Sequence, residues 1–522
     1  MRLGTGLMGT LLLGMGLALA QSVTFAGRVY HADDPLPADP SLQVTQLENG
    51  LALYLLRNGK PAGLVEYALA LPVGSLSEAD SELGLAHFLQ HIAFTGTERF
   101  PARALRELLE ETGMDFGPDL SAYTSWTETV YTLQAPIGDR ELTRKAVMLL
   151  ADWAQRISFD PEAIEKERKT VMDEERRRLE SLDGRLLDIV VPLYFGDSYF
   201  ARRLPSGDMK VIAGVERPEL LSFYRRWYRP ELMAVIAVGD ADPGTLSMLL
   251  QGELEPLAPL SGPAPPRPPP PLHNGPAYGV FSDPDMPLVV GLLTFKAKPL
   301  QVRTVADFRD WLERELFVTM VSERLAKLLQ RTPSPVQQVY FARSELAGVD
   351  FYEITLVTSA DAVERAFRAA AEELNRICIH GFDPAALDSA KRALKRRLKE
   401  DLDARTSAGS AELRKSLIAS YLNEVPFTPP RWNHQAGLQL LKGIVPDEVS
   451  ARARLFAGAE NRIAIVLGPE REKAGLPRKE DLAALLDSAF SAPRTGTGRY
   501  FCGEPPAGQL ALQEKRFPPG PP

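Results

Sequence analysis

The sequence repeats one set of markers in its two halves. Phe159-Asp160-Pro161 begins a charged, helix-like stretch, and Phe382-Asp383-Pro384 begins another one 223 positions later. About 80 residues after each marker, an apolar stretch ends in a glycine, at Gly239 and at Gly468. A glutamate stands eight positions before each of these glycines. Markers with nearly equal offsets predict a domain of about 220 residues that occurs twice.

Length and composition agree with two globular domains. A single domain usually holds about 100 to 200 residues, and this chain has 522. Charged residues make up 25% of the sequence and hydrophobic residues 45%, which argues against a disordered or fibrous chain. The net charge is −8 and no sustained basic block occurs, so we expect no nucleic-acid partner. Two cysteines, Cys378 and Cys502, cannot form a disulfide framework, and the sequence leaves their pairing open.

The first twenty residues have the pattern of a secretory signal. Arg2 supplies a positive charge, Leu3 to Leu19 is an apolar run, and small residues stand at Ala18 and Ala20. We expect a signal peptide at residues 1–20, and no stable membrane insertion after its cleavage, because no second run of this kind follows. An uncleaved anchor is the alternative, since the run is about long enough to cross a bilayer. The pattern predicts a periplasmic or secreted protein.

A proline-rich stretch separates the two copies. Ten of the 21 residues from Pro256 to Pro276 are proline, which favours extended geometry without helix or sheet hydrogen bonds. We interpret it as an interdomain linker, with a proline-rich ligand for a partner domain as the alternative. The expected order is a signal peptide (1–20), an N-terminal domain (21–250), a linker (251–276), a C-terminal duplicated domain (277–495) and a flexible tail (496–522).

Each copy mixes strand-like and helix-like patterns. Leu51 to Leu56 and Val65 to Pro72 predict paired strands, because the turn signal Asn58-Gly59-Lys60-Pro61 lies between them. Tyr131 to Ala135 predicts a further strand. The helix-like stretches of the first copy are Gly84 to Thr95, Ala102 to Thr112, Arg140 to Ile157 and Pro161 to Leu182. The pattern predicts an α+β protein of two duplicated domains, each a mostly antiparallel sheet with helices packed on one face.

Two histidines and two glutamates form a candidate metal site in the first copy. His87 and His91 are four positions apart, which places both imidazoles on one face of a helix. Zinc held by two histidines often takes a carboxylate as its third protein ligand. Glu167 and Glu174 are seven positions apart and share a helical face, so one could bind metal while the other orients a histidine. From these residues alone, a structural histidine pair and a solvated charged helix remain open as alternatives.

A family resemblance rests on several ordered motifs around these residues. His87-Phe-Leu-Gln-His91, with Phe94-Thr-Gly-Thr-Glu-Arg-Phe-Pro101 after it, resembles the inverted zinc motif H-x-x-E-H of the pitrilysin/insulin-degrading-enzyme family. The similarity continues through Ser121 to Tyr131, Glu167 to Glu174, Arg203 to Gly207 and Phe223 to Pro230. It spans most of the first copy and is looser in the second.

The resemblance implies a metal site, a chamber and a peptide-binding strand. Zinc would be held by His87, His91 and Glu174, with Glu167 behind them, and the paired domains would close around unfolded peptides. Family members add the substrate as a strand to a sheet edge, which here corresponds to the segment Ser121, Ala122, Tyr123 and Thr124. The family usually has asparagine at the position of Ser121, so a weaker grip on the peptide backbone is expected.

Gln90 is the main departure from the family pattern, because the family has its catalytic glutamate at this position. That carboxylate takes a proton from the attacking water and passes it to the leaving amine. Glutamine can hydrogen-bond water but cannot accept its proton, and losing a general base costs about a hundred- to ten-thousand-fold in rate. We therefore expect zinc binding with weak or no peptide hydrolysis.

A second departure concerns the groups that stabilise the developing oxyanion. Family members usually supply an arginine and a tyrosine for this purpose, and the corresponding region here has Arg331 and Tyr340 without the expected compact spacing. A second metallopeptidase-family subunit is a possible source. Three functions follow as hypotheses: a zinc-binding protein that binds peptides with little hydrolysis, an active metalloendopeptidase, and a structural partner subunit of an active peptidase.

Overall fold

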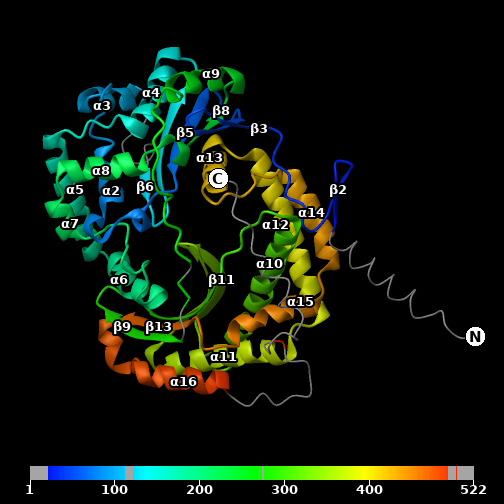
Figure 1. Cartoon of the computed structure of the whole chain (residues 1–522). Helices are drawn as coiled ribbons and strands as arrows, with labels where there is room; N and C mark the ends of the chain where they lie inside the picture. The colour runs from blue at the N-terminus through cyan, green and yellow to red at the C-terminus, as the bar shows by residue number, and fades with distance from the viewer. Residues whose placement is uncertain (1–21, 112–121, 270, 273–274, 492–500, 502–522) are drawn as a thin grey trace, which may run out of the picture.

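The computed structural model describes residues 22–111, 122–269, 271–272, 275–491 and 501. These residues form a six-stranded sheet in the first half, a five-stranded sheet in the second half and a two-stranded hairpin near the N-terminal end (Figure 1). The strands are β1 (Val23–Phe25), β2 (Arg28–Tyr30), β3 (Leu42–Gln46), β4 (Ala52–Arg57), β5 (Leu64–Leu71), β6 (Ala122–Thr124), β7 (Thr129–Pro136), β8 (Ala234–Gly239), β9 (Ala277–Asp283), β10 (Val289–Ala297), β11 (Gln338–Leu346), β12 (Val349–Thr358) and β13 (Arg462–Pro469).

The helices of the first half lie mainly between its strands, whereas most helices of the second half follow strand β12. The helices of the first half are α2 (Leu85–Ile92), α3 (Ala102–Glu111), α4 (Arg140–Gln155), α5 (Pro161–Glu180), α6 (Leu182–Phe195), α7 (Met209–Gly214), α8 (Arg217–Trp227) and α9 (Pro243–Leu254). Those of the second half are α10 (Val305–Ala326), α11 (Val363–His380), α12 (Pro384–Ser407), α13 (Ser410–Leu422), α14 (Pro430–Gly443), α15 (Pro446–Ala451) and α16 (Lys479–Ser491).

The two large sheets share one topology. The strand order is β4-β8-β5-β7-β6 in the first and β9-β13-β10-β12-β11 in the second, with β3 as an additional edge strand of the first sheet. β4 and β8 are parallel, as are β9 and β13, and the other neighbours in both sheets are antiparallel. The predicted α+β class with two duplicated, mostly antiparallel sheets is confirmed.

The repeated Phe-Asp-Pro markers start corresponding helices, α5 and α12. The Asp160 carboxylate accepts the backbone N–H of Ala163 at 2.9 Å, and Asp383 accepts that of Ala386 at 2.8 Å. An aspartate at this position satisfies an otherwise unpaired donor, and the following proline suits the first helical turn because it has no N–H to satisfy. The phenylalanine of each marker is buried and fixes the start of the helix against the core.

Each sheet is covered on one face by helices of its own half and on the other by a helix of the opposite half. In the first half α2, α4, α8 and α9 pack on one face of the sheet. Its other face receives α13, whose Leu417 and Ile418 lie in one cluster with Ile236 of β8 (Figure 1). In return, α6 packs against Ile463 and Ile465 of β13. The sequence predicted helices on only one face of each sheet. The periodicity of a helix shows that it has an apolar face, but it does not show which sheet that face packs against.

Buried polar contacts also join the two halves. Arg414 of α13 forms an ion pair with Glu66 of β5. Lys296 of β10 donates hydrogen bonds to the carbonyl oxygens of Tyr194 at 2.7 Å and Pro271 at 2.5 Å. Burial lowers the pKa of Lys296 to about 7. Lys296 therefore fastens the end of α6 and part of the proline-rich segment to the second sheet.

Both ends of the described chain lie against the second half. Tyr30, at the end of the β1–β2 hairpin, contacts Trp432 of α14 edge to face, with 6.3 Å between ring centroids. The backbone N–H of Phe501 donates to the carbonyl oxygen of Cys378 at 2.9 Å. Cys378 is disulfide-bonded, and Cys502, the other cysteine of the sequence, lies outside the described residues.

The described part of the chain contains no helix that combines the length and the apolar character needed to cross a bilayer. The predicted signal peptide, residues 1–20, lies outside the described residues.

Candidate metal centre

Helix α2 presents its two histidines on one face because its opposite face is buried. Phe88, Leu89 and Ile92 are fully buried in the first core, while the imidazoles of His87 and His91 remain partly accessible. This division is the amphipathic pattern expected of a short helix that lies on a sheet. The histidines therefore project from the packed layer toward α5.

The start of α2 is held by a carboxylate from the loop that precedes it. Gly84, the residue before the helix, has a φ of 96° and no side chain to act as a cap. The Glu78 carboxylate takes over this task, because it accepts the backbone N–H groups of Gly84 and Ala86, each at 2.9 Å. Burial raises the pKa of Glu78 to about 8 against the effect of these hydrogen bonds. Glu78 thus fixes the first turn of the helix that carries His87.

Helix α5 lies next to α2 and brings both glutamates to the histidines. Ile164 and Val171 bury the inner side of α5. Arg168 of α5 donates hydrogen bonds to the carbonyl oxygens of Ile212 and Val215, the latter at 2.8 Å, which anchors the helix to α7 and its following loop. Glu167 and Glu174 were predicted to share one face of a helix, and this face of α5 lies toward α2.

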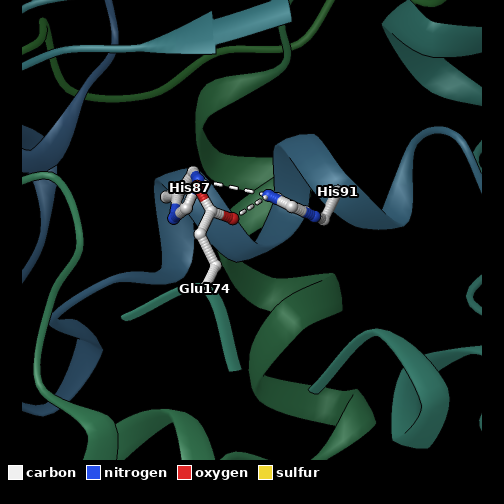
Figure 2. Close-up of side chains that lie close together, drawn as sticks. All are labelled: His87, His91 and Glu174. Atoms are coloured by element: carbon white, nitrogen blue, oxygen red, sulfur yellow. Dashed lines mark hydrogen bonds and ion pairs between the residues drawn. The ribbon is translucent and has the colours of Figure 1, made fainter. Parts of the chain in front are cut away.

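Three of the predicted residues converge (Figure 2). Ligand atoms of His87, His91 and Glu174 all lie within 4.8 Å of one another. The Nε2 atom of His91 is 3.2 Å from Nε2 of His87 and 3.3 Å from Oε2 of Glu174. On the other side of the His91 ring, Oε2 of Glu167 is 3.5 Å from Nδ1. Glu174 thus reaches the shared space between the imidazoles, whereas Glu167 contacts the far nitrogen of one of them.

The electrostatics of this cluster reflect two imidazoles and two carboxylates held close together. Burial and the neighbouring His91 lower the pKa of His87 to about 4. Burial also opposes protonation of His91, but its hydrogen bonds to Glu167 and Glu174 outweigh burial and raise its pKa to about 9. Among the described residues, the buried Nδ1 of His87 has no hydrogen-bond partner. Two imidazole nitrogens and a carboxylate oxygen at these separations form a donor set that fits zinc.

Gln90 lies in the same helix, next to His91, and its side chain accepts a hydrogen bond from a neighbouring strand. It is 9% exposed. The Thr124 hydroxyl donates a hydrogen bond to Oε1 of Gln90 at 3.3 Å. Thr124 belongs to β6, an edge strand of the six-stranded sheet. The Gln90 amide therefore connects the histidine helix to this sheet edge.

The remaining predicted residues lie at the edge strand or elsewhere in the fold. Ala122, Tyr123 and Thr124 form β6, and the Tyr123 side chain is 43% exposed, whereas Ser121 lies outside the described residues. Arg331 forms an ion pair with Glu373 of α11, with 2.8 Å between Nη2 of the arginine and Oε1 of the glutamate. Tyr340 lies on β11 of the second half and is exposed.

The sequence interpretation missed the contacts that position these residues. It did not identify Glu78, because a carboxylate seven residues before the first residue of the helix carries no local capping signature. It also did not identify the contact between Thr124 and Gln90, since it joins a strand to a helix that is distant in sequence. The only signal for Glu78 was its acidic character shortly before the histidine helix, which it shares with Asp80 and Glu82.

Two family models match the chain. The model of insulinase (peptidase family M16) matches residues 54–191, and the model of the peptidase M16 inactive domain matches residues 214–394. A zinc protease PQQL-like protein of Arabidopsis thaliana is 31% identical over 407 residues, which cover 78% of this chain and 40% of that protein. The probable zinc protease PqqL of Escherichia coli K12 is 29% identical over 439 residues, which cover 84% of this chain and 47% of PqqL. The chain thus spans less than half the length of these relatives.

Solved structures show the same architecture. The first half of the periplasmic protease PqqL from Escherichia coli has a TM-score of 0.82 and 25% identity, and the match covers 88% of this chain and 98% of that one. Pitrilysin has a TM-score of 0.67 at 18% identity and shares the fold over 88% of this chain and 50% of its own. With both family models matched and the fold shared, the chain belongs to the insulinase family, peptidase family M16.

Proposed function

We propose that this protein is an exported, zinc-binding member of its family that holds unfolded peptides between its two halves and hydrolyses them weakly or not at all. One observation carries the proposal. Three side chains suited to zinc converge at the helix that also carries Gln90, and the family resemblance assigns Gln90 to the position of the general base. The site would therefore combine the means to bind a metal with the loss of the group that moves the proton.

His87, His91 and Glu174 would hold the metal, and Glu167 would orient the His91 ring through Nδ1. When bound, zinc supplies Lewis acidity, which polarises a peptide carbonyl and lowers the pKa of water. The names of the curated relatives, which include two zinc proteases, support zinc as the ion. The contact between Glu167 and His91 commits that carboxylate to the histidine, so it is poorly placed to replace the missing base.

Peptide binding would use the edge of the first sheet. A sheet edge presents unpaired backbone groups that can pair with an added strand. The segment from Ala122 to Thr124, with Ser121 before it, would supply this edge beside the metal. Because Thr124 of β6 donates a hydrogen bond to Gln90, a peptide paired with β6 would be held at a fixed distance from the Gln90 side chain.

Two alternatives have support in particular observations. An active metalloendopeptidase is favoured by the relatives named zinc proteases. A structural partner subunit has support in the match of residues 214–394 to the model of the peptidase M16 inactive domain. Export to the periplasm is supported by the solved relative, the periplasmic protease PqqL of Escherichia coli.

Zinc titration of the metal-free protein tests the metal site. We expect about one zinc per chain in the wild-type protein, as for a single site with three protein ligands. Glu174→Gln should abolish tight binding because it removes a ligand charge, and Glu167→Gln should weaken zinc binding by about 10- to 100-fold. The measurement is calorimetry or competition with a chromogenic chelator.

Asp173→Asn is a matched control for this titration. Asp173 is the neighbour of Glu174 on α5, is exposed and pairs with Arg176 at 3.1 Å. Its substitution should leave zinc binding unchanged. The proposed site is wrong if the wild-type protein takes up no zinc, or if Glu174→Gln binds zinc as tightly as Asp173→Asn does.

A further inference from the structure

The second half contains a cavity that the metal site does not use. It has a volume of about 320 Å³ and lies between α10, α12, α14 and the loop before α14. Phe308 and Trp311 of α10, whose rings stack with centroids 5.4 Å apart, form part of its apolar wall. Leu398 and Leu402 of α12 contribute to the same lining. Concave, mostly apolar cavities with a few polar groups are typical of ligand sites.

One cation, Arg405, lines this cavity without a direct ion pair among the described residues. Arg405, in the last turn of α12, places its guanidinium over the Phe427 ring, 4.0 Å from the centroid. Its Nη2 atom is buried and has no hydrogen-bond partner among the described residues. No described carboxylate lies within 4.0 Å of it, and the charge of Asp39 acts on it only from a greater distance, whereas Arg309 and Arg452 of the same half form direct ion pairs with acidic residues. A buried donor that carries charge is costly to leave unpaired, so an anion at this position would be favoured.

Further donors lie at the same cavity. Asn433 and His434 of α14 are both part of its lining. The Thr428 hydroxyl donates to Oδ1 of Asn433 at 2.7 Å, which leaves the amide N–H groups of Asn433 to donate elsewhere. Asp401, the one acidic residue of this lining, is exposed. The cavity therefore combines an apolar wall with a group of donors around a single guanidinium.

A second cavity borders on this one and on the first half. It has a volume of about 400 Å³, lies between the two halves and shares the lining residues Val302 and Val425 with the first cavity. It is also lined by Trp126, Thr127 and Glu128, which belong to the turn between β6 and β7. The two cavities are therefore neighbours, and a peptide paired with β6 would extend through the second cavity to reach Arg405.

We propose that the cavity at Arg405 binds the C-terminal residue of a peptide. The free carboxylate would pair with the Arg405 guanidinium, which matches a carboxylate with two parallel hydrogen bonds. An apolar last side chain would pack against Trp311 and Phe308. The single guanidinium and the apolar wall favour one carboxylate attached to an apolar body over a multiply charged anion. The identity of the ligand as a peptide rests on the proposed function.

Binding of a short peptide to the full chain tests this inference. The probe is N-acetyl-leucyl-phenylalanine, compared with the same compound carrying a C-terminal amide, and calorimetry measures both. We expect the acid to bind in the micromolar to millimolar range and the amide to bind at least about tenfold more weakly. Arg405→Gln should weaken binding of the acid to the level of the amide. Arg431→Gln, an exposed arginine at the start of α14, should leave it unchanged.

The alternative outcomes separate this inference from the proposed function. Equal binding of acid and amide, no binding of either, or binding that Arg405→Gln leaves intact would overturn the inference. In the last case Arg405 would serve only to stabilise the C-terminal end of α12. Longer unfolded peptides that still bind the wild-type protein and Arg405→Gln equally well would then leave peptide binding at β6 in place. Binding of the short acid alone, without long peptides or zinc, would instead count against the proposed function.

Discussion

Replacing Gln90 by glutamate should raise the rate of peptide hydrolysis by at least about a hundredfold, because the substitution restores a general base in the place where only an amide now stands. The two side chains have the same shape, and the Thr124 hydroxyl can donate to either of them at the 3.3 Å contact. A carboxylate next to a bound cation keeps its charge even when it is mostly buried. The measurement is kcat/KM on an unfolded fluorogenic peptide, with zinc quantified in the same samples.

The double variant Gln90→Glu with Glu174→Gln is the control for this experiment. It carries the new carboxylate without a complete metal site, so it should remain as inactive as the wild-type protein. Fast hydrolysis by the unaltered protein would defeat the assignment of Gln90 as the missing base. An inactive but zinc-loaded Gln90→Glu variant would show that the oxyanion groups are lacking, since Arg331 is committed to Glu373.

The single substitution Arg414→Met should lower the free energy of unfolding by about 3–5 kcal/mol, because it leaves the Glu66 carboxylate buried without the guanidinium of Arg414. The two side chains are 9% and 11% exposed and join α13 of the second half to β5 of the first. Replacing both partners, as in Arg414→Met with Glu66→Gln, should recover most of this loss, since no unpaired charge then remains. Urea denaturation at neutral pH gives the free energies of unfolding.

An exposed ion pair provides the comparison for Arg414. Arg365 and Asp361 lie 3.9 Å apart on the surface of the second half, and Arg365→Met should leave the denaturation midpoint unchanged because solvent screens such pairs. If Arg414→Met were as mild as Arg365→Met, the Arg414 pair would not hold the halves together. In that case the apolar contacts of α13 would be sufficient.

The parts of the fold that could be predicted from the sequence are those encoded locally. The Phe-Asp-Pro markers combine a helix cap with a proline in the first turn, so their repetition revealed two equivalent helices, α5 and α12. The spacings of His87 with His91, and of Glu167 with Glu174, follow helical periodicity. The structure brings these four side chains together, as two adjacent helices allow.

The remaining features depend on contacts between distant segments, which local patterns do not encode. Leu417 shows that α13 has an apolar face, but nothing near it indicates that this face covers the sheet of the other half. Glu78 caps α2 from a loop, and Thr124 reaches Gln90 from a separate strand. In the sequence, Arg405 cannot be told apart from the other basic residues of a charged helix. Its place at a cavity results from the packing of α10, α12 and α14.

The position of the metal is the most direct test of the account. Crystals of the zinc-loaded wild-type protein, measured on both sides of the zinc absorption edge, should show one strong anomalous peak bonded to His87, His91 and Glu174. The Gln90 amide should lie beside this peak without replacing any of the three ligands. A peak elsewhere in the molecule, or zinc-loaded crystals in which these three side chains point away from the ion, would contradict the account.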